Sequence, residues 1–188
     1  MPTPALYNDC AYTLVSAEEL SAIVDRLAAE IQATYESSGR RLVMVVILKG
    51  SMPFAADLMK RLDLPLEVEC MKVSSYGAGT KSSGEIKVSL DLNRDDLQDI
   101  DLLVVEDIID SGRTLSRLTE LLRHRNAHSV RTCTLLDKPS RREVPFIPDF
   151  CGTAIPDEFV VGYGLDYNEK YRNLPFVGVL KREIYEKK

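Results

Sequence analysis

One nine-residue segment constrains the fold of this chain more than any other feature. It follows the run Leu102–Val105, whose continuous apolar character is typical of a strand buried inside a parallel sheet. After it, leucines recur at helical spacing, at Leu115, Leu118, Leu121 and Leu122. The pattern therefore predicts a strand, a loop centred on Glu106–Thr114, and a helix. Because ligands of open α/β sheets bind beyond the carboxyl ends of the strands, we expect this loop to lie at a ligand site.

The residue types in this loop indicate a sugar phosphate. Backbone N–H groups at the start of the helix and the hydroxyls of Ser111 and Thr114 suit a phosphate monoester, and Gly112 allows the backbone to approach it closely. Glu106 and Asp107 are acceptors suited to the two hydroxyls of a ribose. A carboxylate pair beside a phosphate is repulsive unless a sugar diol or a metal ion lies between them. The alternative is an ordinary strand-to-helix turn whose acids cap the helix.

Composition limits the class of protein. With 188 residues, of which 45% are hydrophobic, we expect one substantial core and a single domain, residues 1–188. A net charge of −5 gives no support to a nucleic acid or a membrane as the main partner. The four cysteines form no CxxC or Cys/His cluster, which favours free thiols in a reducing compartment; they are Cys10, Cys70, Cys133 and Cys151. No targeting pattern or membrane-span length appears, and we expect a cytoplasmic protein.

Hydrophobic periodicity predicts an α/β fold. Ser16 and Glu19 form a capping-box pair that begins an amphipathic helix, which ends near Gly39. A second helix begins at Ser51 or Pro53 and reaches about residue 62. Besides the motif strand, strands are expected at 42–48, 66–73, 86–90, 130–136, 159–161 and 176–180. The alternation favours a mostly parallel, twisted sheet flanked by helices, with a core of about 16–137 and an irregular segment from 138 onward that forms a small cap.

Further segments fall at the same edge of the predicted sheet. Lys49–Ser51 follows the strand at 42–48 and can hold a diphosphate, although it lacks the upstream glycine of a P-loop; the alternative is a surface lysine in a loop. Lys138 follows the strand at 130–136, where it is a suitable donor to a carbonyl oxygen. For Arg141 and Arg142 we favour a solvated charged turn over a phosphate site.

Several motifs, in order, resemble one family. Glu106–Thr114, read as two acids, two aliphatic residues, an acid and then hydroxyl-Gly-basic-Thr, resembles the phosphoribosyl-diphosphate (PRPP) motif of the type I phosphoribosyltransferases. Lys138, between Asp and Pro, and the segment Phe159–Glu169 resemble the bacterial hypoxanthine-guanine phosphoribosyltransferases. The resemblance runs from about residue 42 to 180. The family has Thr or Ser at Ser111 and commonly Lys at Arg113, so both positions are mild variants.

The resemblance implies a fold, a reaction and a set of site residues. The fold is the type I phosphoribosyltransferase sheet with a small cap, or hood, formed from the chain ends. The reaction transfers the 5-phosphoribosyl group of PRPP to a 6-oxopurine, hypoxanthine or guanine, in purine salvage. Residues that match PRPP contacts are Glu106, Asp107, Ile109, Asp110, Ser111, Gly112, Arg113 and Thr114. Diphosphate contacts match Lys49, Gly50 and Arg172, and purine contacts match Lys138, Phe159, Val160 and Asp166. Asp110 matches the general acid/base at purine N7.

The family also implies a metal, a lid and an assembly. Mg²⁺ would be held mostly by substrate and water oxygens, with the carboxylates of Glu106, Asp107 and Asp166. The small-residue segment 74–84 matches a mobile lid that closes with Ser75 and Tyr76, and a cis peptide bond is expected at Leu48–Lys49. A homodimer or homotetramer is expected on family grounds. Two alternatives stay open: xanthine as a further substrate, and an RNA-binding attenuator with the same fold, which would need a basic face.

Overall fold

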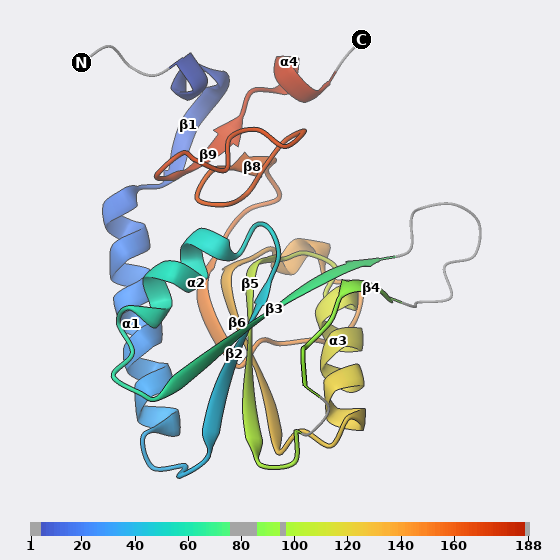
Figure 1. Cartoon of the computed structure of the whole chain (residues 1–188). Helices are drawn as coiled ribbons and strands as arrows, with labels where there is room; N and C mark the ends of the chain where they lie inside the picture. The colour runs from blue at the N-terminus through green and yellow to red at the C-terminus, as the bar shows by residue number, and fades with distance from the viewer. Residues whose placement is uncertain (1–4, 76–85, 95–96, 187–188) are drawn as a thin grey trace.

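The computed structural model describes residues 5–75, 86–94 and 97–186, which form two sheets and their flanking helices (Figure 1). The elements in chain order are η1 (Ala5–Asp9), β1 (Cys10–Val15), α1 (Ala17–Tyr35), β2 (Arg41–Ile47), α2 (Met52–Met59), β3 (Leu66–Ser75), β4 (Ile86–Leu90), β5 (Ile100–Ile109), α3 (Arg113–His124), β6 (Ser129–Asp137), η2 (Pro139–Arg141), β7 (Phe150–Ala154), β8 (Val160–Val161), β9 (Val177–Leu180) and α4 (Arg182–Tyr185). The α/β class predicted from the sequence is confirmed.

The larger sheet has six strands in the order β4-β3-β2-β5-β6-β7. All neighbours are parallel except β3 and β4, which are antiparallel. The central strands β2 and β5 are almost continuously buried, as expected for strands covered by helices on both faces. In the register between β5 and β6, Ile109 lies opposite Asp137, so Asp110 and Lys138 follow at the same edge of the sheet, as predicted.

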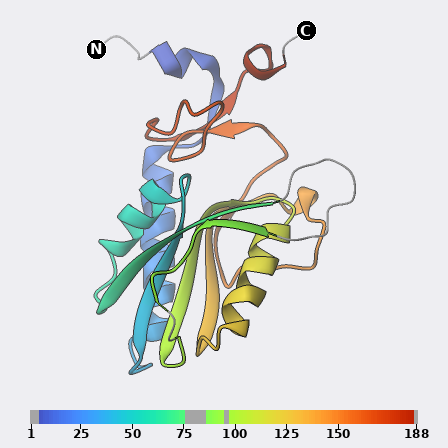
Figure 2. The same ribbon diagram turned by 45° about the vertical axis from the view of Figure 1, so that its right-hand side comes forward.

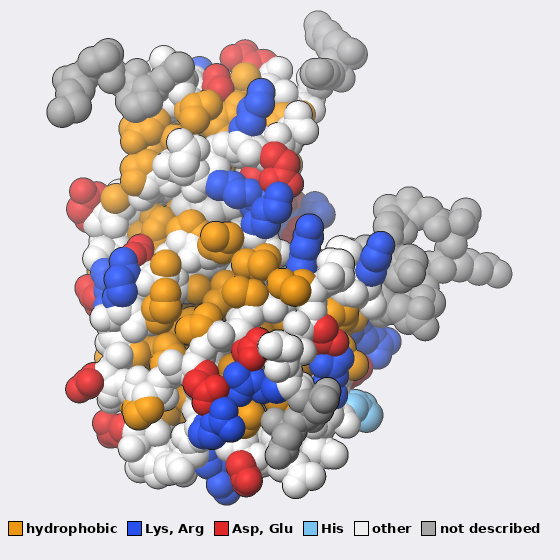
Figure 3. Space-filling view, viewed as in Figure 1, with side chains coloured by type: hydrophobic (Ala, Val, Ile, Leu, Met, Phe, Trp, Pro, Cys, Tyr) orange, Lys and Arg blue, Asp and Glu red, His pale blue; other side chains and the backbone are white. Residues whose placement is uncertain are grey.

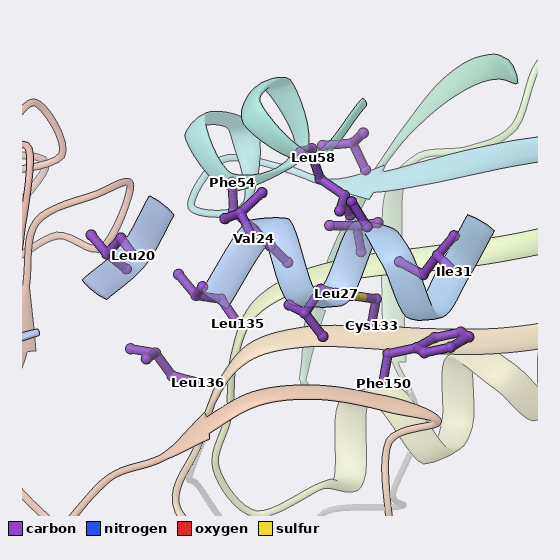
Figure 4. Close-up of a cluster of buried hydrophobic side chains, with 14 of the residues drawn as sticks. Leu20, Val24, Leu27, Ile31, Phe54, Leu58, Cys133, Leu135, Leu136 and Phe150 are labelled. Atoms are coloured by element: carbon purple, nitrogen blue, oxygen red, sulfur yellow. The ribbon is translucent and has the colours of Figure 1, made fainter. Parts of the chain in front are cut away.

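Helices cover both faces of this sheet (Figure 2). On one face, α1 and α2 pack against side chains such as Met44, Leu103 and Cys133. Figure 4 shows this layer, in which side chains of α1 meet Phe54 and Leu58 of α2 and also the inward residues of β6 and β7. On the other face, leucines of α3 pack against Val104 and its neighbours in a second cluster. Each buried aliphatic or aromatic side chain stabilises the fold by about 1.5–3 kcal/mol, so these two layers hold the edge loops in place.

The first helix begins as its sequence predicts. The Ser16 hydroxyl accepts a hydrogen bond from the N–H of Glu19 at 3.1 Å, and the Glu19 carboxylate accepts one from the N–H of Ser16 at 2.7 Å. This reciprocal capping box satisfies two N–H groups that a helix N-terminus leaves without partners. It also fixes the point at which the chain leaves β1 and enters the main layer.

The smaller sheet has three antiparallel strands in the order β1-β9-β8 and forms a hood above the main sheet (Figure 1). In it, Cys10 of β1 lies opposite Leu180 of β9, and Val161 of β8 lies opposite Gly178. The hood therefore joins segments that are far apart in the sequence. The two short C-terminal strands predicted from the sequence are present as β8 and β9.

Two expectations need correction. We expected the segment after residue 137 to belong to the cap, but β7 pairs in parallel with β6 and extends the main sheet, with Phe150 opposite Cys133. The motif strand is also longer than predicted, because β5 continues through Glu106 and Asp107 to Ile109. The acidic pair therefore belongs to the strand and only Asp110–Gly112 form the loop before α3.

Candidate active site

A cavity of about 440 Å³ opens at the carboxyl edge of the main sheet. It is lined by the ends of β2, β3 and β5, by the loop that enters α3, and by two residues of the hood. Its lining residues are Ile47, Leu48, Lys49, Gly50, Val73, Ser74, Glu106, Asp107, Ile108, Ile109, Asp110, Ser111, Gly112, Thr114, Leu115, Asp166 and Arg172. Most residues predicted to contact PRPP or diphosphate are therefore brought together, from three separate parts of the sequence.

Three segments of the chain meet closely at one side of this cavity. A Cβ atom built on Gly50 would lie 1.5 Å from a carboxylate oxygen of Asp107, and one built on Gly164 would lie 1.8 Å from the carbonyl oxygen of Gly50. Gly164 also has a φ of +103°, which L side chains rarely adopt. The peptide bond between Leu48 and Lys49 is cis, as predicted. Only glycine fits at these two contacts, which join β5, the Lys49 loop and the hood.

The acidic pair at the end of β5 is electrostatically coupled. Burial, reinforced by the negative charge of Asp107, raises the pKa of Glu106 well above its usual range. Burial also raises the pKa of Asp107, but hydrogen bonds from Glu106 and from the N–H of Ile108, the latter at 2.8 Å, oppose that rise. Both shifts favour the protonated carboxyl group, and the effect is larger for Glu106 than for Asp107.

The loop after β5 is held by the segment that follows β6. The backbone N–H groups of Lys138 and Glu143 donate to the carbonyls of Ile109 and Ser111, at 2.9 and 3.0 Å. Gly112 ends the loop with a φ of +81°, and α3 begins at the next residue. A Cβ on Gly112 would come within 3.0 Å of an Arg142 methylene carbon. The phosphate-binding geometry expected of this loop thus depends on a second loop packed against it.

Arg142 corrects the sequence-based interpretation. Its guanidinium group is mostly buried, pairs with the carboxylate of Asp137 and donates a hydrogen bond to the carbonyl of Asp110. Arg141 is half-exposed and donates from Nε to Oδ1 of Asp110 at 3.1 Å. Arg141 is therefore an exposed charged turn residue, as expected, whereas Arg142 is not. The sequence feature that could have indicated these contacts is the position of the two arginines. They come just after Lys138, at the sheet edge that Lys138 shares with Asp110.

A loop of the hood brings Arg172 to the cavity. Arg172 donates to the carbonyl of Gly164 at 2.8 Å and pairs with Asp166 at 2.7 Å, while its Nε is buried without a hydrogen-bond partner. Glu169 accepts from Lys49 at 3.0 Å and from Arg172 at 3.3 Å. These two hydrogen bonds lower the pKa of Glu169, the bond from Lys49 being the larger cause. No role was predicted for Glu169 from the sequence; here it joins Lys49 and Arg172, two of the three predicted diphosphate contacts.

Three of the predicted purine residues lie outside this cavity, whereas the fourth, Asp166, lines it. The ammonium group of Lys138 donates to the carbonyl of Glu158 at 2.7 Å, which ties β6 to the segment before β8. Val160 is buried within β8, and Phe159, 37% exposed, stacks on Tyr185 of α4 with ring centroids 4.7 Å apart.

One predicted PRPP contact also falls outside the cavity. Arg113 is absent from its lining and pairs with Glu143 at 2.6 Å. The side chain of this first residue of α3 therefore faces the segment that follows η2, and not the space in which the phosphate is expected.

The predicted lid falls mostly outside the described residues. Ser75 is the last residue of β3, and Tyr76 belongs to a stretch that the structure does not describe. Within the described ranges, no helix is long and apolar enough to cross a bilayer.

The carboxylates do not form a metal site made by protein alone. No group of three or more His, Cys, Asp or Glu residues that could hold a metal is found among the residues described. Glu106, Asp107 and Asp166 nonetheless line one cavity as oxygen donors. That donor set fits an ion such as Mg²⁺, which is usually held by one or two carboxylates together with substrate phosphates and water.

Comparison with known proteins identifies the family. A family model described as "Phosphoribosyl transferase domain" matches residues 13–168. The chain belongs to the phosphoribosyltransferase family. It is 50% identical over 179 residues to the hypoxanthine-guanine phosphoribosyltransferase of Bacillus subtilis, covering 95% of this chain and 98% of that one. It is 52% identical over 181 residues to the bifunctional protein TilS/HprT of Listeria innocua, covering 96% of this chain but only 28% of the length of that protein.

Solved structures agree with this family assignment. A hypoxanthine phosphoribosyltransferase from Staphylococcus aureus has 44% sequence identity and a TM-score of 0.93, with both chains covered completely. A mutant hypoxanthine phosphoribosyltransferase from Trypanosoma cruzi, solved as a ternary substrates complex, has 37% identity and a TM-score of 0.90 over 95% of this phosphoribosyltransferase chain and all of that one. The type I fold expected from the sequence is thereby confirmed.

Proposed function

We propose that this chain transfers the 5-phosphoribosyl group of PRPP to hypoxanthine or guanine, yielding the purine 5′-monophosphate and diphosphate. The observation that carries the proposal is the cavity that joins the β5–α3 loop, the Lys49–Gly50 backbone and Arg172. Its relatives named hypoxanthine-guanine phosphoribosyltransferase support the choice of base. The role is purine salvage.

The two ends of the cavity would hold the two phosphate groups of PRPP. Backbone N–H groups at the start of α3 and the hydroxyls of Ser111 and Thr114 suit the 5′-phosphate. At the other end, Arg172, with an unpartnered Nε, and the Lys49–Gly50 backbone suit the diphosphate. Between them, Glu106 and Asp107 would accept from the ribose hydroxyls. The acidic pair then faces the sugar, and both phosphate groups face donors.

Mg²⁺ would be held by Asp166 and by PRPP oxygens, with the acidic pair acting through the ribose diol. When bound, the ion neutralises charge on the departing diphosphate.

Asp110 would accept the proton from purine N7, because its carboxylate lies at the mouth of the phosphate loop. Closure of the lid with Ser75 and Tyr76 would exclude water from an oxocarbenium-like ribose.

Base recognition would fall to the segment beside the cavity. Lys138 has three donor hydrogens, one of which is used on the Glu158 carbonyl, so another can meet a purine 6-oxo group. Adenine presents an amino group there and would place a donor against a donor. Phe159 would stack on the base, and the backbone of Val160 would meet its Watson–Crick edge.

A turnover assay with a panel of bases tests this proposal. With PRPP and Mg²⁺, we expect hypoxanthine and guanine to be converted and adenine to be converted at least about 10³-fold less efficiently, because a donor-lined site left unpaired discriminates strongly. Excess chelator should abolish turnover. Comparable kcat/KM values for adenine, or full activity with chelator, would contradict the assignment of Lys138 or the requirement for Mg²⁺.

We also propose that the chain assembles as a homodimer or homotetramer in the cytoplasm. The described cysteines are free thiols, which suits a reducing compartment. Hydrophobic side chains gather over α2 and the neighbouring part of the sheet (Figure 3), and Met52, Met59 and Val68 are exposed there by 53, 39 and 47%. An exposed apolar surface of this kind is typical of an interface between proteins.

A further inference from the structure

A chain of charged side chains connects the two halves of the site. Arg141 of η2 lies between two acids: its Nε is 3.1 Å from Oδ1 of Asp110, and its Nη1 is 3.6 Å from Oδ2 of Asp157. The other oxygen of Asp157 is 4.0 Å from the ammonium group of Lys138. Asp110 lines the cavity, whereas Asp157 comes two residues before Phe159. The guanidinium group of Arg141 therefore joins the loop that would hold PRPP to the segment that would hold the base.

The two neighbouring arginines hold Asp110 in different ways. Arg142 is mostly buried and bonds to the carbonyl of Asp110, so it fixes the backbone. Arg141 donates a hydrogen bond to the carboxylate of Asp110, at its Oδ1 atom. An arginine that engages one carboxylate oxygen leaves the second free, and restricts the rotation of the side chain about its Cβ. Proton transfer requires such an orientation, because a general base works only within hydrogen-bond reach of its proton.

We propose that Arg141 is a positioning residue that orients the Asp110 carboxylate toward the purine. The proposal rests on the proposed function, in which Asp110 accepts the N7 proton. The three side chains Arg141, Asp110 and Asp157 are 52, 46 and 51% exposed. Ion pairs so exposed add little to the stability of a fold. The contribution of Arg141 is therefore to the geometry of the reacting carboxylate, and its loss should be measurable in turnover and not in unfolding.

A double-mutant cycle tests this inference. Arg141→Ala should lower kcat by about 3- to 30-fold while changing the KM for PRPP by less than about twofold, since misplacement of a reacting group mainly affects the chemical step. In the Asp110→Asn background the same substitution should change the residual kcat by less than about 1.5-fold, because no carboxylate remains to be oriented. Arg141→Lys should recover part of the loss.

Two variants serve as comparisons. Arg117→Ala removes a similarly exposed arginine that pairs with Glu120 on α3, and should leave kcat unchanged. Arg142→Ala removes the support of the backbone, so its effect should persist in the Asp110→Asn background and include a higher KM for PRPP. The melting temperature of the Arg141→Ala protein should match that of the wild type.

The outcomes separate this inference from the proposed function. If Asp110→Asn alone keeps a near-normal kcat, Asp110 is not the base, and both proposals fail. If Asp110→Asn impairs kcat but Arg141→Ala has an equal effect in both backgrounds, the base stands and the positioning role is wrong. If the effect of Arg141→Ala disappears instead in an Asp157→Asn background, Arg141 acts on the purine segment and the inference is overturned.

Discussion

Asp110 and Glu106 stand four residues apart in one motif but have different surroundings. Asp110 is half-exposed and accepts a hydrogen bond from Arg141. Glu106 lies inside β5, where desolvation and its neighbour Asp107 favour the protonated form. An exposed acid at the mouth of the loop suits proton transfer, and an acid inside the strand suits a hydrogen bond to a sugar hydroxyl.

This difference predicts a separation of two kinetic effects. Asp110→Asn keeps the shape of the side chain but removes the base, so kcat should fall by about 10²- to 10⁴-fold. PRPP binding should change much less, because the loop N–H groups, Ser111 and Thr114 remain. Asp107→Asn should act mainly on PRPP binding. Steady-state kinetics and direct PRPP titration of both variants measure the separation. A main defect in PRPP binding for Asp110→Asn would make Asp110 a structural cap instead.

The raised pKa of Glu106 predicts a pH-dependent stability difference. Above the ordinary pKa of 4.5, the unfolded chain releases the Glu106 proton while the folded protein retains it, so this residue lowers stability as pH rises. Glu106→Gln is neutral in both states. The variant should therefore unfold at higher denaturant concentration than wild type near pH 7, and the difference should disappear below about pH 4.5. Denaturant titrations in metal-free buffer at both pH values provide the test. If Glu106→Gln increased the stability equally at both pH values, a raised pKa of Glu106 would not be the cause.

At the residue scale, the sequence predicted which residues belong to the site better than it predicted which of them contact one another. The motif, the cis bond at Leu48–Lys49 and the edge shared by Asp110 and Lys138 followed from local pattern and from family resemblance. The ion pair of Lys49 with Glu169 did not, because the two residues are 120 positions apart and meet only through the packed hood. Arg142 was misjudged for a similar reason: nothing local shows that it will be buried.

Among the strands, the sequence pattern predicted neither β1 nor β7, and β7 shows the physical reason. Its sequence, Phe-Cys-Gly-Thr-Ala, has neither a continuous apolar run nor clear alternation, and Pro148 precedes it closely. Its position is fixed by tertiary contacts. A Cβ on Gly152 would lie 2.2 Å from the carbonyl of Leu135 and 2.9 Å from Ile23 of α1. The absence of a side chain there allows α1 to cover this strand, which periodicity cannot reveal.

The contact between the hood and the Lys49 loop predicts a sharp loss of function on a small change. Gly164→Ala would push the hood loop away from Gly50, and a shift of about 1 Å at such a site costs up to about 10²-fold. We expect the KM for PRPP to rise about 10- to 100-fold. Gly39→Ala is the matched control, since Gly39 also has a positive φ, +66°, but no atom lies within 4 Å of a Cβ built on it. The control should lose only about 1–2 kcal/mol of stability.

If Gly39→Ala and Gly164→Ala raised the KM for PRPP equally, backbone strain and not the close contact would be responsible. An unchanged KM in Gly164→Ala would show that the hood loop can retreat without cost to the site.

For the whole molecule, the exposed methionines of α2 predict where copies of the chain meet. Replacing Met52 and Met59 together by lysine places two charges on this surface, and each buried methionine contributes about 1.5–3 kcal/mol. The dissociation constant of the assembly should rise at least about tenfold. Light scattering after size exclusion measures it over a concentration series. Ile147→Lys, at an apolar position that is 89% exposed, is the control and should leave the assembly intact. A monomeric wild-type protein would remove the basis for the prediction.

The pairing of β1 with β9 has a consequence for the order in which the protein matures. Val15 and Val177 are partners, yet a ribosome that adds about 5–20 residues per second makes them on the order of ten seconds apart. The main sheet, including β7, is complete by Ala154, so it can fold while the hood still lacks β8 and β9. Asp166 and Arg172 are made only after that sheet. A nascent chain thus completes the β5–α3 loop early and acquires Arg172 late, so the cavity at the sheet edge gains its full lining only near the end of synthesis.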